Sequence, residues 1–427
     1  MKRILIAVFI VMVAITAFAG GQTDTAEEGK VLKFWDMQNG PADTYPVTAQ
    51  KLCDQFSAAN PGVKVEYQSI PWDNFYQTFL TAIKSGAAPD VSTGGFGMHE
   101  VFAQMGEILY VDSVVEEYKA DGRVDDFPQG FLELHTYEGK QVGIPYMTAI
   151  FTHFYRTDMF QNAGIGTPPE TWAEFLDAGR AIKNAFDIPF FAINLADAQG
   201  NNYVLSLLLA NDTGVLDKNM QPLLAGKKAI ETYEFMITMF KEELVPKGMA
   251  TYRTADVEKA YMNGKISAFT QYIPVYVKDD PNVARVTDAL PVMRGPSGSK
   301  GTLTWVNMIG GYQQTKHPEE AKKFIGWYAD NCYPLFTEGG ANALPARKSF
   351  MDKYSSTDDP IIRGIVRECA DYMRNPVYPV DYLYSKFGQI DGENLLAQLG
   401  QMIFTGETDP VKIGQRGVDL VQKALAE

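Results

Sequence analysis

The chain has 427 residues, more than one hydrophobic core usually supports, so we expect two domains or lobes. Its composition is 46% hydrophobic and 21% charged, which is typical of a globular protein and argues against disorder. The formal net charge of −14 disfavours nucleic acid and anionic membranes as partners, because both bind through positive patches.

Residues 1–19 have the pattern of a signal peptide. A basic start at Lys2 precedes an apolar run at 4–15, and the small residues around Ala19 form a cleavage site. The run is shorter than the roughly 20 residues that a membrane-spanning helix needs. No cysteine follows the cleavage region, so we expect an exported protein without lipid attachment, in which residues 20–30 form a flexible segment ahead of the fold.

The chain then alternates between strand and helix patterns. Short hydrophobic runs at 31–35 and 63–67 predict strands, and amphipathic stretches at 47–59 and 75–86 predict helices. This order is typical of a parallel sheet covered by helices.

Helix patterns recur further along the chain. Thr171 and Glu174 form a capping box, in which each side chain accepts a hydrogen bond from the other's backbone amide, at the start of a helix that runs to about Phe186. Amphipathic stretches at 226–243 and 318–330 predict two more helices. We find no internal repeat at a fixed period.

The cysteines predict no disulfide framework. Cys53, Cys332 and Cys369 are an odd number in an exported chain. Cys53 shares a helical stripe with Phe56, and Cys369 shares one with Ile365, which indicates small buried hydrophobic residues. A pairing of Cys332 with Cys369 stays open.

Sequence signatures of catalysis are missing. His99 and Glu100 begin "HEVFA", but Ala103 stands where a zinc protease has its second histidine. There is no GxSxG, no phosphate loop and no GxGxxG, so we expect no enzymatic activity, no cofactor and no metal. A secreted carbohydrate-active enzyme stays open as an alternative, because its two carboxylates meet only in space.

Aromatic residues stand beside turns instead of in periodic stripes. The clearest cases are Trp72, Phe96, Tyr146, Tyr272, Trp305 and Tyr312. Aromatic rings at loop ends suit a pyranose, whose C–H faces stack on a ring while its hydroxyls form hydrogen bonds. The alternative is that these rings are core residues near strand ends.

Six segments, in this order, resemble the family 1 extracellular solute-binding proteins, which are the sugar-binding subunits of ABC importers. They are "FSAANPGVKVEYQSIPWDNFYQTFLTAIKSGAAPDV" (56–91), "YEGKQVGIPY" (137–146), "FYRTDMFQNAGIGTPPETWAEF" (154–175), "MNGKISAF" (262–269), "GGYQQTKHPEEAKKFIGWYAD" (310–330) and "GANALPARKSF" (340–350). The resemblance covers nearly the whole mature chain.

The resemblance implies an α/β fold of the type II periplasmic binding protein kind, in which each of two lobes is a mainly parallel sheet flanked by helices. It implies discontinuous lobes joined by hinge crossovers, with 31–146 plus 274–315 in lobe 1 and 147–273 plus 316–427 in lobe 2. A ligand that contacts both lobes favours the closed state. The implied function of this monomer is to capture a sugar or oligosaccharide and deliver it to the permease subunits of an ABC transporter. A non-sugar solute, such as a polyol phosphate or a peptide, is the alternative ligand.

The resemblance also implies ligand-binding residues, from loops at strand ends that face the space between the lobes. They are Asp36, Gln38, Trp72, Gly95, Phe96, Tyr146, Asn201 or Asn202, Gln271, Tyr272, Trp305, Gly311, Tyr312 and Arg347. The chain departs from the family after "GIPY", where many sugar binders have a charged or amide residue and this chain has the mainly apolar run 147–151. We therefore expect an apolar floor under the ligand.

Overall fold

The computed structural model describes residues 29–72, 75–95, 97–356, 358–380, 383–384 and 386–426. The predicted signal peptide, residues 20–28 and the candidate Phe96 lie outside the described residues. Lys30, which we assigned to a flexible segment, already belongs to the first strand. Among the described helices, none has both the length and the apolar character needed to cross a membrane.

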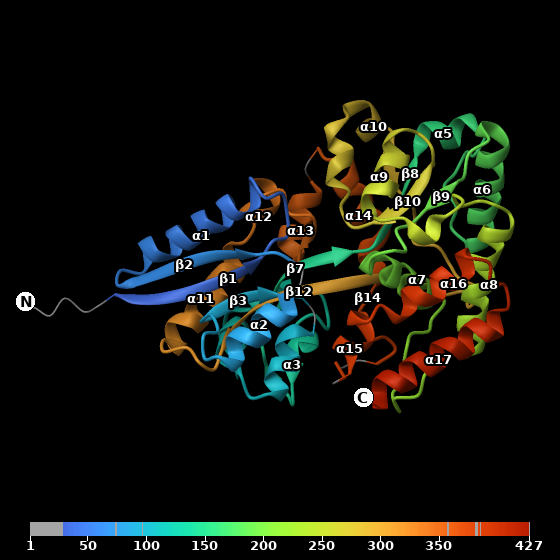
Figure 1. Ribbon diagram of the computed structural model, residues 1–427. Helices are drawn as coiled ribbons and strands as arrows, with labels where there is room; N and C mark the ends of the chain where they lie inside the picture. The colour runs from blue at the N-terminus through green and yellow to red at the C-terminus, as the bar shows by residue number, and fades with distance from the viewer. Residues whose placement is uncertain are drawn as a thin grey trace, which may run out of the picture.

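The chain forms two lobes connected by long strands (Figure 1). Lobe 1 is built on an eight-stranded sheet with the order β13-β7-β12-β3-β1-β2, to which β4 and β14 are added through β12. Its strands are β1 (Lys30–Met37), β2 (Val63–Ile70), β3 (Val91–Gly94), β4 (Ile108–Leu109), β7 (Ile144–Ile150), β12 (Thr302–Tyr312), β13 (Leu344–Pro345) and β14 (Met373–Arg374). A separate hairpin pairs β5 (Thr136–Tyr137) with β6 (Lys140–Gln141).

Hydrophobic stripes bind the helices of lobe 1 to its sheet. The buried face of α1 includes Leu52, Cys53 and Phe56, and the Phe56 ring packs edge-on against Phe324 of α11 at 5.0 Å. Cys53 therefore lies in the core, as predicted. The helices of this lobe are α1 (Tyr45–Ala59), α2 (Phe75–Lys84), α3 (Met98–Gln104), α4 (Asp112–Asp121), α11 (Pro318–Asn331), α12 (Pro334–Thr337) and α13 (Lys348–Ser355).

Lobe 2 is built on a four-stranded sheet with the order β11-β8-β10-β9. Its strands are β8 (Thr152–Arg156), β9 (Phe191–Ala192), β10 (Ala268–Gln271) and β11 (Thr287–Ala289). Its helices are α5 (Thr157–Asn162), α6 (Trp172–Phe186), α7 (Ala198–Ala210), α8 (Lys227–Lys241), α9 (Thr254–Met262), α10 (Pro281–Arg285), α14 (Pro360–Cys369), α15 (Phe387–Gly392), α16 (Leu395–Phe404) and α17 (Pro410–Ala426).

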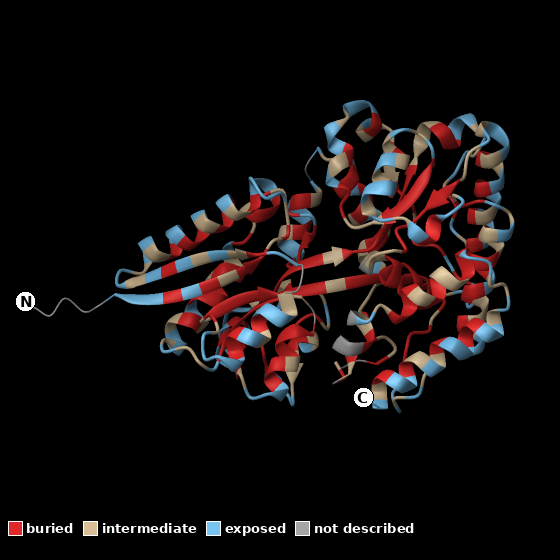
Figure 2. Cartoon of the chain, in the orientation of Figure 1, coloured by how far each residue is buried: buried red, intermediate tan, exposed pale blue. Residues whose placement is uncertain are grey.

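The capping box predicted for lobe 2 is present at the start of α6. The Thr171 hydroxyl accepts from the backbone N of Glu174 at 3.2 Å, and the Glu174 carboxylate accepts from the backbone N of Thr171 at 3.0 Å, so the capping box that starts α6 is confirmed. Helix α7 is buried on nearly all sides among α16, α8 and the crossing strand β12 (Figure 2).

Both sheets are mixed instead of mainly parallel. β1 pairs in parallel with β2 and β3, but β12 runs antiparallel to β3 and β7, and β8 runs antiparallel to β10 and β11. The reason is topological. β7 takes the chain out of lobe 1 and β12 brings it back, so these two strands run in opposite directions.

The structure also divides the chain differently from our prediction. β11 pairs with β8, so 274–289 belongs with lobe 2 and not with lobe 1. Helix α11 packs on β12, β7 and α1, so 318–331 belongs with lobe 1 and not with lobe 2. The chain crosses between lobes after β7, along β12, and between α13 and α14. Helical patterns alone do not say which sheet a helix covers, which is why the prediction missed this.

The three cysteines are buried free thiols. Cys332 ends α11 in lobe 1, whereas Cys369 ends α14 in lobe 2. The pairing that the sequence left open is therefore not formed.

Candidate functional site

Three predicted site residues meet at one edge of the lobe 1 sheet. β1, β2 and β3 are parallel and end at this edge, and Gln38, Trp72 and Gly95 follow within two residues of the strand ends. The Trp72 indole Nε1 donates to the backbone O of Gln38 at 3.0 Å, and a Cβ added to Gly95 would lie 3.3 Å from Trp72 Cζ3. Trp72 is 37% exposed. Its N–H therefore holds the indole in place while much of the ring remains open to solvent.

The crossing strand β12 brings Trp305 toward this edge. Trp305 pairs with Ala149 of β7, and Met308 pairs with Gly94 at the end of β3. Directly paired residues place their side chains on the same face of a sheet. The small Ala149 stands beside the half-buried Trp305 indole, whereas Met147, Ile150 and Phe151 of the same run are buried in the core.

Lobe 2 contributes a phenol and an amide. Asn202, in the first turns of α7, donates through Nδ2 to the Tyr272 hydroxyl at 3.0 Å. Burial and the nearby Asp391 carboxylate raise the pKa of Tyr272 well above its usual range, although a hydrogen bond with Trp305 opposes the shift. The phenol therefore stays protonated, and its hydrogen is available to donate to a ligand because its oxygen is the acceptor toward Asn202.

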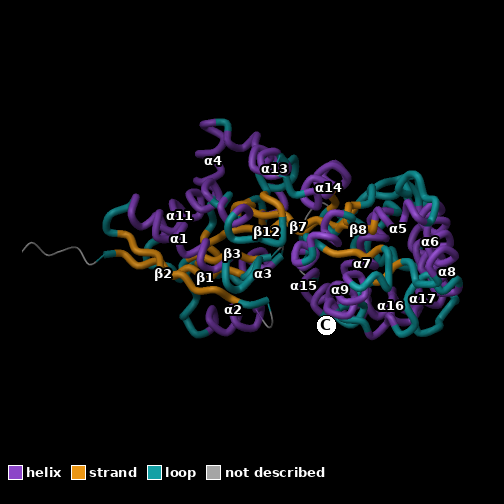
Figure 3. Tube along the Cα trace, turned by 90° about the horizontal axis from the view of Figure 1, so that it is seen from above, coloured by secondary structure: helices purple, strands orange, loops and turns teal. Residues whose placement is uncertain are grey.

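Helix α15 adds an aromatic ring that the sequence analysis missed. The Phe387 ring lies 6.0 Å from the Trp305 ring, measured between centroids. A Cβ added to Gly97, at the start of α3, would lie 3.3 Å from Phe387 Cδ1. Because α15 packs on α16 and α17 of lobe 2, this proximity is a contact between the two lobes, and α3 and α15 lie side by side in both views (Figures 1 and 3).

Asp391, also from α15, is a second residue that the sequence analysis missed. Its carboxylate Oδ1 accepts from Asn201 Nδ2 at 2.8 Å. Burial raises the pKa of the Asp391 carboxyl to about 6, although the hydrogen bond from Asn201 opposes the shift. At neutral pH most of this group is ionised and accepts hydrogen bonds.

We call this set the junction site, because it lies where the two lobes meet. Its members are Gln38, Trp72, Gly95, Ala149, Asn202, Tyr272, Trp305, Phe387 and Asp391. None of these residues is lysine or arginine. The site combines two indoles with neutral donors and one carboxylate acceptor, which suits an uncharged, polyhydroxylated ligand with apolar faces.

A family model described as bacterial extracellular solute-binding protein matches residues 39–331, more than half of the chain. The chain belongs to this family. The resemblance seen in the sequence motifs is thereby confirmed, and with it the assignment as an extracellular solute-binding protein.

Relatives of this solute-binding protein include one with a solved structure and two found by sequence comparison. A sugar transporter from Arthrobacter chlorophenolicus A6, solved with bound laminaribiose, is 28% identical, covers 92% of this chain and 99% of its own, and aligns with a TM-score of 0.80. A binding protein of Brucella abortus (strain 2308) is 26% identical over 311 residues, which make up 71% of this chain and 74% of the relative. The mannitol-binding protein of Pseudomonas aeruginosa is 22% identical over 318 residues, 71% of each chain. The structural match confirms the two-lobed α/β fold.

Two predicted contacts, Asp36 and Tyr146, lie inside lobe 1 of the solute-binding protein. Asp36 is 0% exposed, and its carboxylate accepts from Thr93 Oγ1 at 2.7 Å. Tyr146 is 1% exposed, and its hydroxyl accepts from Asn39 Nδ2 at 3.0 Å. Both side chains are already satisfied within the lobe, so we leave them out of the junction site.

Replacing Asp36 with asparagine is expected to stabilise the protein at high pH. Burial raises the pKa of Asp36 to about 7, although hydrogen bonds from Thr93 and Tyr67 oppose the shift. An acid with a raised folded pKa stabilises the fold when protonated and loses that contribution as the pH rises through 7. Asparagine keeps an oxygen for Thr93 without a charge. We expect a gain of about 2 to 4 kcal/mol in the free energy of unfolding at pH 8, and a much smaller gain at pH 4. Urea unfolding at both pH values measures it, and a gain that does not grow with pH would contradict the assignment.

Gly311 and Tyr312 lie at the opposite end of β12 from the junction site. Tyr312 is 0% exposed, stacks on Phe79 at 6.2 Å and shares a hydrogen bond of 2.9 Å with Ser92 Oγ. Seven residues of extended strand separate it from Trp305, or about 23 Å. Both residues are therefore part of the lobe 1 core.

The candidates Asn201 and Gln271 lie next to residues of the junction site and make contacts within lobe 2. Asn201 donates to Asp391 and accepts from the backbone N of Leu396 at 3.0 Å, so its amide joins α7 to α15 and α16. Gln271 is half-buried and pairs with Thr152 within the lobe 2 sheet.

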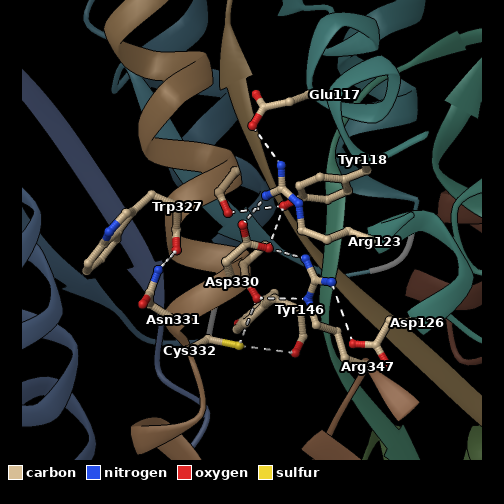
Figure 4. A network of polar contacts seen from close by, with 12 residues as sticks. Glu117, Tyr118, Arg123, Asp126, Tyr146, Trp327, Asp330, Asn331, Cys332 and Arg347 are labelled. Atoms are coloured by element: carbon tan, nitrogen blue, oxygen red, sulfur yellow. Dashed lines mark hydrogen bonds and ion pairs between the residues drawn. The ribbon is translucent and has the colours of Figure 1, made fainter. Parts of the chain in front are cut away.

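Arg347 stands in an internal ion-pair network of lobe 1 (Figure 4). Its guanidinium donates to the Asp330 carboxylate and lies over the rings of Tyr118 and Phe127, 5.0 and 4.6 Å from their centroids. Its side chain is only 5% exposed. Arg347, which the resemblance placed among the ligand-binding residues, therefore directs its guanidinium at a carboxylate of α11.

Proposed function

We propose that this solute-binding protein captures a neutral carbohydrate, a sugar or a short oligosaccharide, between its two lobes. The observation that carries the proposal is the pair of indoles at the junction site. Trp72 comes from the edge of lobe 1, and Trp305 comes from the strand that crosses to lobe 2. The likeness to the sugar transporter that binds laminaribiose, at 28% identity, supports the same ligand class.

The polar groups of the junction site fit the rim of a pyranose. The Tyr272 hydroxyl is a donor, the Asp391 carboxylate is an acceptor, and sugar hydroxyls are both. A phosphorylated polyol would require cationic side chains, and the junction site includes none. The mannitol-binding relative makes a linear polyol the second candidate, but a polyol lacks the ring faces that two indoles would stack on.

We further propose that ligand binding closes the lobes. β7 and β12 connect them, and a ligand that contacts Trp72 of lobe 1 and Tyr272 or Asp391 of lobe 2 gains both sets of contacts only when the lobes approach each other, so it favours the closed state. In this proposal residues 1–19 are removed on export to the periplasm, no lipid is attached, and the closed monomer delivers its ligand to the permease subunits of an ABC transporter without chemical change.

Calorimetric titration against laminaribiose, maltose, mannitol and a tripeptide tests the ligand class. We expect saturable one-site binding of at least one disaccharide, and weaker or no binding of mannitol and the peptide. The same mixtures, incubated overnight, should release no monosaccharide. Binding of mannitol or the peptide alone would overturn the carbohydrate proposal, and steady hydrolysis would overturn the assignment as a non-enzyme.

A further inference from the structure

Asn307 is a nearly buried amide that hydrogen-bonds none of the residues the structure describes. It lies on β12 two residues beyond Trp305 and is 6% exposed. Within the described ranges its side chain takes part in no hydrogen bond, yet its polar atoms are not fully sealed from solvent. Sealing such an amide from water without a partner would cost about 1 to 3 kcal/mol, so the opening that its polar atoms keep gives access to water or to a ligand hydroxyl.

The strand geometry directs Asn307 to the junction site. Side chains alternate along a strand, so Asn307 shares a face with Trp305, whereas Thr304 and Val306 point the other way. Thr304 and Val306 line a separate groove of about 250 Å³ on that opposite side, together with the segment from Gln129 to Leu134. Asn307 is therefore on the side of the indole.

A β-bulge sits at this position. The pairing of β12 with β7 runs from Asn307 opposite Met147 to Met308 opposite Pro145, so the register shifts between Asn307 and Met308. The extra residue is Tyr146 of β7, opposite the step from Asn307 to Met308, and bulges are frequent next to functional sites. Met308 also pairs with Gly94, which places Asn307 level with Gly95, the residue that packs against Trp72.

We propose that Asn307 is a specificity-determining residue that hydrogen-bonds a ligand hydroxyl between Trp72 and Trp305. This inference rests on the proposed function. A primary amide has both a donor and an acceptor. It can donate to the oxygen of a ligand hydroxyl or accept from its hydrogen, and it therefore selects ligands with a hydroxyl at this point. The bound ligand then satisfies the amide that the free protein leaves unpaired.

The test compares Asn307→Ala with the wild-type protein and with a matched control. The probe is the disaccharide that the wild-type protein binds, laminaribiose or maltose, together with its monodeoxy analogues. We expect Asn307→Ala to bind the parent disaccharide about 10- to 100-fold more weakly. For one of the monodeoxy analogues, the affinity of the wild-type protein should fall by the same factor. The Asn307→Ala variant should bind that analogue as well as it binds the parent disaccharide. Thr304→Val, on the opposite face of β12, should bind normally.

Thermal unfolding separates ligand contact from a structural role. We expect Asn307→Ala to melt at or above the wild-type temperature without ligand, because the substitution removes an unpaired polar group. Equal disaccharide affinity of variant and wild type, or a lower melting temperature that accounts for the loss, would overturn the inference and leave the proposed function standing. Absence of saccharide binding by the wild-type protein would overturn both.

Discussion

Replacing Trp305 with alanine is expected to weaken disaccharide binding about a hundredfold. The indole is half-buried on the strand that joins the lobes, and it contacts the Phe387 ring at 6.0 Å and neighbours Tyr272. Central aromatic residues of this kind contribute about 2 kcal/mol or more when truncated. The loss would remove a stacking surface and the support of two other site residues. Trp72→Ala, at the more exposed rim, should cost about tenfold.

The control for Trp305→Ala is Trp327→Phe. Trp327 packs against Phe56 at 5.5 Å within lobe 1, away from the junction site, so its replacement should leave affinity unchanged. Calorimetry with the same disaccharide measures all three variants. If Trp305→Ala bound as tightly as the wild-type protein, the junction site would not be where the ligand binds.

Replacing Asp330 with alanine is expected to destabilise the fold by about 3 kcal/mol. Of the described residues, the change would leave the Arg347 guanidinium, 5% exposed, with only Asp126 at 3.7 Å as an anionic partner. Removing one partner of a buried pair leaves an uncompensated charge, which costs about 3 to 5 kcal/mol. The Tyr118 hydroxyl and Arg123 would lose the same acceptor. We place the expectation at the low end because Asp330 is 24% exposed.

Urea unfolding, followed by circular dichroism, checks the Asp330 variant. Glu66→Ala is the matched control, since it removes a surface pair with Lys64 whose side chains are 49% and 68% exposed, and it should change stability by less than about 1 kcal/mol. Disaccharide affinity of the folded Asp330→Ala protein should be normal. If the Asp330→Ala variant kept its stability but lost disaccharide binding, Arg347 and its partners would be part of the ligand-binding site.

Local patterns were sufficient for much of the fold. The capping box of Thr171 and Glu174 marked the start of α6, and the stripe of Cys53 and Phe56 marked the buried face of α1. The lobe division failed where it depended on pairing between distant segments. β11 lies beyond residue 273, where we predicted the return to lobe 1, but it pairs with β8 of lobe 2, and no local pattern encodes that choice.

The candidate site divides in the same way. Trp72 stood out because an aromatic ring beside a turn has no helical stripe to join, and the structure places it at the lobe junction. Tyr312 and Arg347 carried equally good local signals, but burial against Ser92 and Asp330 depends on tertiary packing. Asn307 could not be found from the sequence, because its missing partner and the register shift beside it exist only in the folded sheet.

The five tryptophans allow the central claim to be tested in one spectrum. In an NMR spectrum of the isotope-labelled protein, single substitutions assign each indole N–H signal. The signals are then followed while the disaccharide that the protein binds is added. Carbohydrate capture at the lobe junction predicts saturable shifts of the Trp72 and Trp305 signals. The signals of Trp172, stacked on Phe235 at 4.6 Å inside lobe 2, and of Trp327 should stay in place. Saturable binding that shifts Trp172 or Trp327 and leaves Trp72 and Trp305 unmoved would contradict it.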